Sequence, residues 1–232
     1  MGRQQRKCLM DEINIFKMRD IAVFGGGGFG REVKTIIDKI NEVNPNTYNF
    51  IGFYDDGIEK GKIVNGYPVL GGLEDVNNYK EELNLVISIG DPNIKTNILN
   101  KISNSKINYP SVIHPNASIS NDDVAIGNGC IICEGTIITC NIKIGNFVIL
   151  NLSCTVGHDT VIEDYCAFMP SVNVSGEVII KKGVYVGTGA KIINLLEIGE
   201  NTIVGAGAVV SKSLPAKCTA VGIPAKPIKF HG

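Results

Sequence analysis

The chain has 232 residues, a formal net charge of −1 and a hydrophobic content of 44%. This length allows one large domain or two modest ones, and the near-zero charge gives no basic footprint for a nucleic acid. No apolar run reaches the ~18 residues needed to span a bilayer, and the 7 cysteines, an odd number without a secretion signal, argue against a disulfide framework.

Residues 1–18 are expected to form a flexible extension. Their basic residues are followed by Asp11 and Glu12, which interrupt the apolar stretch that a signal peptide requires. A cytoplasmic protein that does not bind a membrane is therefore expected.

Residues 21–40 predict a phosphate-binding opening. A short apolar strand at 21–24 runs into a glycine-rich turn at 25–30 and then into a helical pattern at 31–40. Glycine lets a ligand approach the backbone, and a helix N-terminus offers free N–H groups and the positive end of a dipole. The turn also matches G-x-G-x-x-G, which is a weak signal alone. Three readings stay open: a turn without a ligand, a dinucleotide site, and a site for a nucleotide joined to another group such as a sugar.

Two further strands complete a predicted Rossmann-type domain over residues 19–108. One strand spans 48–54 and ends in a pair of aspartates, and the other spans 85–89 and leads to a helix at about 93–102. Alternating strands and helices with short connections predict a small parallel sheet.

A six-residue repeat governs residues 109–215, ahead of a C-terminal tail at 216–232. From Ile126 every sixth residue is large and apolar, and a second column two residues earlier is mostly small or β-branched. Positions i and i−2 of a strand share a face, so both columns are predicted to point inward. Strands and turns without helices predict a parallel β-helix, a three-sided prism with about eighteen residues per coil and five regular coils. The large column comprises Ile126, Ile132, Ile138, Ile144, Leu150, Val156, Ile162, Phe168, Val174, Ile180, Val186, Ile192, Ile198, Val204 and Val210.

Glycine often follows the large position, as at Gly127 and Gly145. We expect these corners to need φ values that residues with a Cβ resist. Cysteines in the small column, such as Cys166, are expected to serve as core residues. The other cysteines, Cys8 among them, show no C-x-x-C spacing with one another, so no metal site is predicted.

His158 is the histidine whose position points to chemistry. It occupies an outward corner of the repeat with Asp159 beside it, and a carboxylate next to an imidazole can fix the tautomer of the imidazole. Because one coil adds eighteen residues, Gly176 is predicted one coil above, where its N–H can face a developing oxyanion. A surface histidine without function is the alternative. His114, in a proline-flanked bridge, is expected to be structural, and His231 to lie in a disordered tail.

Several motifs together carry a family resemblance. They are the hexapeptide repeat, the turn 24–33, Tyr54 with its two aspartates, the bridge 110–117, Asn151 ahead of Gly157-His-Asp, and the segment 221–226. This set resembles the hexapeptide-repeat sugar acetyltransferases, which include UDP-4-amino-sugar N-acetyltransferases and sialic acid O-acetyltransferases. The resemblance implies a small Rossmann-like domain followed by a left-handed parallel β-helix.

The resemblance also implies a homotrimer with acetyl-CoA, and no metal, between neighbouring prisms and a nucleotide-activated sugar on the N-terminal sheet. His158 would be the general base, Asp159 its orienting partner and Gly176 the oxyanion donor. The implied substrate-binding residues are Gly25, Gly26, Gly27, Gly28, Phe29, Asp55, Asp56 and Asn151. The implied CoA-binding residues are Gly176, Gly187, Gly205, Gly222, Ile223, Pro224 and Ala225.

Two positions depart from the pattern of many family members. Phe29 stands in the glycine turn where some carry histidine, and Ala167 stands nine residues after His158 where many carry another histidine. Both changes reduce the polar lining of the implied acceptor pocket.

The function favoured by this set of features is transfer of acetyl from acetyl-CoA to the amino group of a nucleotide-linked amino sugar, of the UDP-4-amino-sugar type. Attack of an amine on a thioester needs a base near neutral pH, which imidazole supplies, so no covalent enzyme intermediate is required. O-acetylation of sialic acid or another surface-polysaccharide sugar is the alternative. A nucleotide-sugar-binding or NAD-binding protein with a degenerate prism, and a purely structural β-helix, are the readings from other classes.

Overall fold

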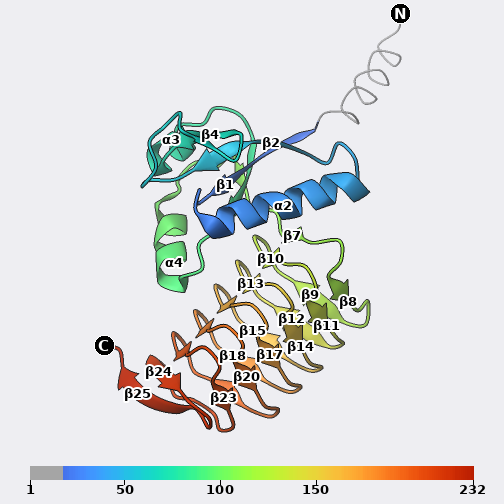
Figure 1. The fold of residues 1–232 in the computed structure, drawn as a ribbon, viewed down its shortest axis with the longest axis vertical. Helices are drawn as coiled ribbons and strands as arrows, with labels where there is room; N and C mark the ends of the chain where they lie inside the picture. The colour runs from blue at the N-terminus through green and yellow to red at the C-terminus, as the bar shows by residue number, and fades with distance from the viewer. Residues whose placement is uncertain (1–17) are drawn as a thin grey trace, which may run out of the picture.

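A computed structural model describes residues 18–232, in which a small sheet domain is joined to a three-sided prism (Figure 1). The predicted N-terminal extension and Cys8 fall on residues 1–17, outside the described residues. In Figure 1 the sheet domain lies over one end of the prism, and helix α2 lies between the two parts.

The N-terminal domain is a six-stranded sheet of order β3-β4-β2-β1-β5-β6. All neighbouring strands are parallel except the β3–β4 hairpin. The predicted Rossmann-type sheet is therefore confirmed. The strands are β1 (Arg19–Phe24), β2 (Tyr48–Tyr54), β3 (Ile63–Val64), β4 (Tyr67–Gly71), β5 (Leu83–Ile87) and β6 (Ile107–Asn108). The helices are α2 (Gly28–Val43), α3 (Leu73–Asn77) and α4 (Pro92–Lys101).

The long elements form where the sequence pattern is strongest. Ile21 and Val23 of β1 are fully buried, as expected for a parallel strand covered on both faces. In α2, Val33, Ile36 and Ile37 are buried at helical spacing. Within residues 18–232, no helix combines the length and the apolar character needed to cross a bilayer.

The hairpin and α3 were not predicted. Pro68 lies inside β4, and a proline in an apolar run argues against a strand unless the strand lies near an edge, as β4 does. Helix α3 has only five residues, too few for a periodic pattern.

The prism has three parallel faces, and its coils advance by eighteen residues. Successive partners on the first face are Ile131, Ile149, Ala167, Tyr185 and Ile203. The third face has five strands, which matches the five regular coils predicted from the repeat.

The first face contains β7 (Val112–Ile113), β10 (Ile131–Ile132), β13 (Ile149–Leu150), β16 (Ala167–Phe168), β19 (Tyr185–Val186), β22 (Ile203–Val204), β24 (Cys218–Val221) and the antiparallel β25 (Lys226–Phe230). The second face contains β8 (Ser118–Ile119), β11 (Ile137–Ile138), β14 (Thr155–Val156), β17 (Asn173–Val174), β20 (Lys191–Ile192) and β23 (Val209–Val210). The third face contains β9 (Val124–Ile126), β12 (Ile142–Ile144), β15 (Val161–Ile162), β18 (Ile179–Ile180) and β21 (Glu197–Ile198).

The two inward columns form the prism core. Every member is buried except Ile126 in the large column and Leu196 in the small one, which are partly exposed. Cys130, Cys154 and Cys166 are buried in this core, and burial raises the pKa of the Cys166 thiol to about 12. These thiols therefore act as small core side chains, as predicted.

The predicted reason for the corner glycines was wrong. Positive φ occurs three residues after the large position, at residues that include Asn141 (φ 56°) and Phe147 (φ 55°), rather than at the glycine that follows it directly. A Cβ on Gly127 would lie 2.7 Å from the backbone of Gly145 in the next coil. Close approach between coils, and not backbone conformation, therefore accounts for glycine at this corner.

An apolar cluster joins the sheet domain to the prism. Val33 and Ile37 of α2 pack with Ile131, Ile149 and Ala167, which face outward from the first face of the prism. In Figure 1, α2 runs alongside β7 and β10. The outward side of the first face is thus covered by this helix near the N-terminal end.

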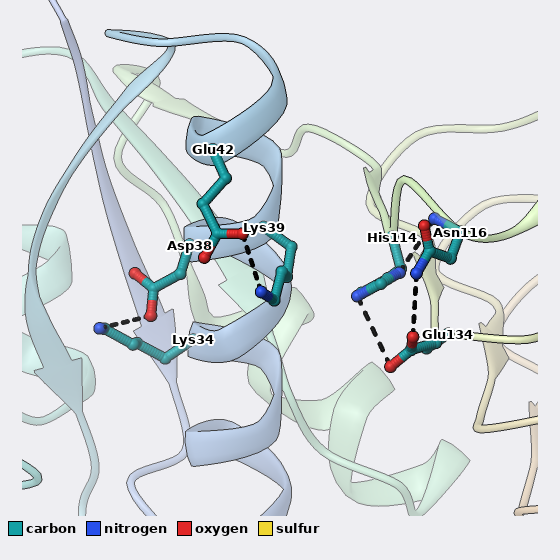
Figure 2. Close-up of polar contacts among 7 residues, drawn as sticks. All are labelled: Lys34, Asp38, Lys39, Glu42, His114, Asn116 and Glu134. Carbon is teal, nitrogen blue, oxygen red and sulfur yellow. Dashed lines mark hydrogen bonds and ion pairs between the residues drawn. The ribbon is translucent and has the colours of Figure 1, made fainter.

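The bridge before the prism holds His114 in a structural setting. The His114 side chain is buried, and its Nδ1 accepts a hydrogen bond from the Asn116 backbone N–H at 3.1 Å (Figure 2). Its Nε2 lies 3.8 Å from Glu134, which accepts a hydrogen bond from the Asn116 amide at 3.0 Å. Figure 2 also shows the Lys34–Asp38 pair on α2, at 2.7 Å. The burial and the contacts of His114 agree with the structural role predicted for it.

The prediction that His231 lies in a disordered tail was wrong. Strand β24 continues the first face past residue 215, and β25 pairs with it. The His231 backbone N–H donates to the Lys217 carbonyl at 2.7 Å, and its Nε2 lies 2.9 Å from the Thr219 hydroxyl. The last residues of the chain are therefore hydrogen-bonded to the segment that contains β24.

Helix α4 contributes a buried lysine that makes stability depend on pH. Lys95 is 1% exposed, and burial lowers its pKa from 10.5 to about 8, with Cys166, Cys130 and Asp91 as the facing titratable groups. Between pH 8 and 10.5 the unfolded chain holds a proton on Lys95 that the folded chain has lost. The free energy of unfolding from this group therefore rises with pH across that window, by about 1.4 kcal/mol per unit.

The test compares urea denaturation of the wild type and Lys95→Met between pH 7 and 10. Buried thiols that resist ionisation lower the stability of both proteins at high pH, so the difference between the two isolates Lys95. The wild type is expected to gain about 2 to 3 kcal/mol relative to the variant across the range. A constant difference would contradict a lowered lysine pKa.

Candidate active site

His158 lies at the corner between the second and third faces, after β14 and before β15. The corner is fixed by coil-to-coil hydrogen bonds: the His158 carbonyl accepts from the Glu177 N–H at 2.8 Å, and the Asp159 N–H donates to the Cys140 carbonyl at 3.1 Å. Asp159 has φ 57°, which turns the chain and leaves the His158 side chain 57% exposed. The local fold therefore presents the imidazole outward on a rigid backbone.

Asp159 fixes the protonation pattern of the imidazole. Its Oδ2 lies 2.7 Å from His158 Nδ1, and its Oδ1 accepts a hydrogen bond from the Asn141 amide at 3.0 Å. The hydrogen bond with His158 and then the one with Asn141 lower the pKa of Asp159, which is therefore an ionised acceptor. Nδ1 must then carry the proton, and in the neutral ring Nε2 is free to accept one. An imidazole held in this way can act as a general base.

Gly176 lies against the imidazole, as the eighteen-residue spacing predicts. A Cβ built on Gly176 would lie 2.6 Å from Cε1 and Nε2 of His158. Within residues 18–232, the Gly176 backbone N–H makes no hydrogen bond to the protein. A free N–H beside a general base can stabilise an oxyanion that forms next to that base.

Substituting Gly176 by alanine is expected to lower kcat/KM by about 10- to 100-fold, because the new methyl group displaces the imidazole. The backbone of Gly176 does not have a positive φ, so alanine fits its conformation and the melting temperature should hold. Steady-state kinetics and thermal unfolding measure the two effects. Asn194→Ala, one coil farther along the same corner, is the control. Full activity in Gly176→Ala would show that the imidazole position is unimportant.

The glycine-rich turn after β1 contains two kinds of glycine. Gly25 and Gly30 are required by packing, since a Cβ on Gly25 would lie 2.6 Å from Ser88 Oγ and one on Gly30 would lie 1.7 Å from the Gly25 carbonyl oxygen. Gly27 has nothing within 4 Å of such a Cβ, and Gly28 has only an Arg31 side-chain nitrogen at 3.9 Å. Helix α2 begins here without a side-chain cap. Its first N–H groups, beside two unhindered glycines, form an anion-binding geometry.

Asp55 and Asp56 hold the loops at the carboxyl edge of the sheet. Asp55 accepts hydrogen bonds from Gly26 N–H at 2.7 Å and Gly57 N–H at 2.8 Å. Asp56 accepts from Leu73 N–H at 2.7 Å and so fixes the start of α3. The structure therefore brings Asp55 to the glycine turn and directs Asp56 to a neighbouring helix.

Asn151 begins a second row of residues, at the edge between the first and second faces of the prism. Met169, Gly187 and Gly205 follow it at steps of eighteen. Asn151 is 6% exposed, and its Oδ1 accepts a hydrogen bond from Leu152 N–H at 2.7 Å. Among the described residues its amide nitrogen donates no hydrogen bond to the protein. The amide N–H groups are therefore free to bind another molecule.

The row continues to the loop 222–225 between β24 and β25. Gly187 and Gly205 are glycines because of packing, since a Cβ on them would lie 2.5 Å from the Ala206 nitrogen and 2.7 Å from the Val221 side chain. Within the loop, Gly222 has φ 99° and Ile223 is exposed. The Ala225 N–H donates to the Val209 carbonyl at 2.8 Å, which ties the loop to the last coil.

The two departures from the family pattern meet in one place. Ala167 is fully buried on the first face, and Phe29 packs against the same apolar cluster, as does Met169. The Met169 methyl group lies 3.7 Å from the Cβ position of Gly90, at the end of the sheet. Met169 was not predicted, although the eighteen-residue step from Asn151 leads directly to it. The part of the junction around Phe29, Ala167 and Met169 is therefore apolar.

One chain does not bring the two groups of predicted residues together. His158 and Gly176 lie at the edge between the second and third faces, whereas Asn151 lies at the edge between the first and second. A six-residue side of the prism separates these edges and spans up to about 20 Å. Reacting atoms must approach to about 3.5 Å. A site that uses both edges needs the second edge from another molecule.

Comparison with known proteins identifies the class of enzyme. Residues 20–102 match the family model described as the PglD N-terminal domain. The chain is 34% identical over 216 residues to a GDP-perosamine N-acetyltransferase of Escherichia coli O157:H7, with coverage of 89% of this chain and 95% of that protein.

Matches to solved structures cover both domains of the chain. A point mutant of perosamine N-acetyltransferase from Caulobacter crescentus, in complex with CoA and GDP-perosamine, has a TM-score of 0.80 at 28% identity, with coverage of 90% and 97%. The acetyltransferase domain of PglB from Neisseria gonorrhoeae, in complex with acetyl coenzyme A, has a TM-score of 0.82 at 28% identity, with coverage of 90% and 99%. WeeI from Acinetobacter baumannii has a TM-score of 0.81 at 36% identity, with coverage of 90% and 100%.

These matches define an acetyltransferase built on a left-handed β-helix with a Rossmann-like N-terminal domain. The chain belongs to the hexapeptide-repeat sugar acetyltransferase family. Among the described residues no group of three or more His, Cys, Asp or Glu side chains is arranged to hold a metal ion.

Proposed function

We propose that this enzyme transfers the acetyl group of acetyl-CoA to the amine of a nucleotide-linked amino sugar. The observation that carries the proposal is the His158–Asp159 pair, 2.7 Å apart, beside Gly176. The named activities of relatives that align over the whole length support an amine acceptor, since they are N-acetyltransferases of perosamine. The UDP-linked form of the acceptor stays a prediction. The GDP-linked form, which is named for the relatives, is therefore tested beside it.

The chemistry needs one base and one oxyanion donor. The neutral amine attacks the thioester carbonyl carbon, and His158 Nε2 takes a proton from the attacking nitrogen. The Gly176 N–H donates a hydrogen bond to the thioester carbonyl oxygen as that oxygen becomes negative. The C–S bond then breaks, and the imidazolium returns its proton to the CoA thiolate. A base contributes typically about 10²- to 10⁴-fold, and an oxyanion donor about 10²- to 10³-fold.

The nucleotide is assigned to the N-terminal sheet. The uncapped start of α2 and the unhindered Gly27 and Gly28 suit a diphosphate, because backbone N–H groups and the helix dipole favour an anion there. Asp55 keeps the turn in shape through its hydrogen bond to Gly26. Phe29 lies beside the apolar junction, where the sugar would enter.

Each active site is proposed to combine residues from two subunits. Asn151, Gly187, Gly205 and the loop 222–225 follow one edge of the prism, while His158 and Gly176 lie on another. If the edge with His158 of one subunit faces the edge with Asn151 of its neighbour, acetyl-CoA fits along the groove between them. A closed ring of three such contacts gives the homotrimer that the family resemblance implies. Analytical ultracentrifugation tests it, and a monomer that retains full activity would contradict it.

The function is tested by following thiol release from acetyl-CoA with a chromogenic disulfide. The acceptors are UDP-, GDP- and dTDP-linked 4-amino sugars, with free sialic acid as the hydroxyl acceptor. Rapid release with one amino sugar and none with sialic acid is expected. Turnover of sialic acid alone would replace N-acetylation with O-acetylation, and silence with every acceptor, together with no acetyl-CoA-dependent rise in melting temperature, would remove the proposal.

A further inference from the structure

Helix α4 belongs to the sheet domain, and its Lys95 side chain makes a hydrogen bond to the prism. Ile98, Leu99 and Ile102 pack against the core of the sheet. One turn earlier, Lys95 donates a hydrogen bond from Nζ to the Phe147 carbonyl oxygen at 2.7 Å. Phe147 lies at the corner between the third and first faces of the prism. Lys95 is therefore a direct polar link between the two domains.

The acceptor of this hydrogen bond is held rigidly. Phe147 has φ 55°, and its ring stacks on Tyr165 with centroids 5.7 Å apart and an interplanar angle of 8°. On its other side Tyr109 meets it edge to face at 5.2 Å. Aromatic contacts of this kind fix a ring beyond what apolar burial alone gives. The Phe147 carbonyl oxygen therefore has a fixed position on the prism.

A lysine at this position is costly unless it has a role. Lys95 is 1% exposed, and within residues 18–232 its side chain forms no ion pair with a carboxylate and donates its hydrogen bond to a neutral carbonyl. Desolvation of an ammonium group without a counter-ion is unfavourable, and a methionine of similar length would avoid it. The apolar contact under α2 already holds the domains together, but apolar contacts have no directional preference. A hydrogen bond has a fixed length and direction.

The link lies close to the nucleotide end of the sheet. Helix α4 starts directly after Gly90 and Asp91, at the carboxyl end of β5. At that end the Ser88 hydroxyl donates to the Phe24 and Gly25 carbonyl oxygens at 2.8 and 3.1 Å. A shift of α4 relative to the prism would therefore be passed to the glycine turn.

We propose that Lys95 is a positioning residue that sets the distance between the glycine turn and the prism, and so aligns the acceptor amine with the thioester. This inference rests on the proposed binding of the nucleotide to the sheet and of acetyl-CoA to the prism. It assigns Lys95 no contact with either substrate. Its removal should therefore lower the rate of transfer while each substrate still binds.

The kinetic test uses Lys95→Met, with Lys95→Arg as the conservative variant and Lys101→Met, an exposed lysine on the same helix, as the control. Lys95→Met is expected to lower kcat by about 10- to 100-fold, as misplacement of reacting groups does. The dissociation constants of acetyl-CoA and of the nucleotide sugar, measured separately by calorimetry, should each change less than about threefold. Lys95→Arg should recover most of the rate, and Lys101→Met should match the wild type.

A second readout does not depend on the substrates. Hydrogen exchange of the amides in α4 should quicken in Lys95→Met and stay slow in Lys95→Arg. If the wild type fails to acetylate any amino sugar, the proposed function fails while this exchange result still tests the link. Unchanged kcat, unchanged exchange, or a fall in kcat accompanied by loss of both substrate affinities would overturn the positioning role.

Discussion

Replacing His158 by alanine should lower kcat for acetyl transfer by about 10²- to 10⁴-fold, the usual contribution of a general base. The His158 side chain is 57% exposed and does not belong to the prism core, so the free energy of unfolding should change by less than about 0.5 kcal/mol. The measurement is thiol release under saturating acetyl-CoA and acceptor, together with urea denaturation of both proteins.

Two companion variants sharpen the result. Asp159→Asn keeps the size of the side chain but removes the ionised acceptor that holds the proton on Nδ1, so it should lower the rate less than the loss of the imidazole does. His231→Ala, which removes a histidine bonded to Thr219 in the C-terminal hairpin, should keep the wild-type rate. Equal rates in the wild type and His158→Ala would exclude His158 from proton transfer.

Replacing Gly30 by alanine should abolish nucleotide binding and destabilise the sheet domain by about 2 to 5 kcal/mol. The new Cβ would lie 1.7 Å from the Gly25 carbonyl oxygen, which also accepts a hydrogen bond from Ser88. No rotamer change can relieve that clash, because a Cβ is fixed in place by its own backbone and the Gly25 oxygen is a backbone atom. Chemical denaturation and calorimetric titration with the nucleotide measure the two losses.

Gly28→Ala is the matched variant of the same turn. Its Cβ would meet only an Arg31 side-chain nitrogen at 3.9 Å, and alanine favours the helix over glycine by up to about 1 kcal/mol. Stability should therefore hold or rise, while nucleotide affinity falls because the methyl group occupies the approach to the α2 N-terminus. Full affinity in Gly28→Ala would contradict the assignment of the nucleotide to this turn.

The sequence pattern predicted the parts of the fold that repeat. The inward columns of the prism recur every six residues, so their burial and the eighteen-residue coil followed directly, and this step also placed Gly176 beside His158. The strand, turn and helix of residues 19–43 carry local signals that agree with one another. Elements without a periodic signal, such as α3, were missed.

Contacts between distant segments were beyond the sequence pattern. Gly127 was explained by backbone conformation, but the next coil is what excludes a Cβ there. The sequence pattern did not single out Lys95, because its partner Phe147 is 52 residues away. His158 and Asn151 are separated because they lie on different edges of the three-sided prism. The repeat period alone did not predict that one chain keeps these two residues apart.

Identification of the bond formed in the product tests the central claim most directly. The enzyme is run to completion with acetyl-CoA carrying a labelled acetyl group and the acceptor that gives the fastest thiol release, and the isolated product is treated with hydroxylamine at alkaline pH, which cleaves oxygen esters. Transfer to an amine forms an amide, which keeps its label under these conditions. Loss of the label would reveal an ester and contradict N-acetylation, and a product labelled at the same rate by His158→Ala would contradict the mechanism.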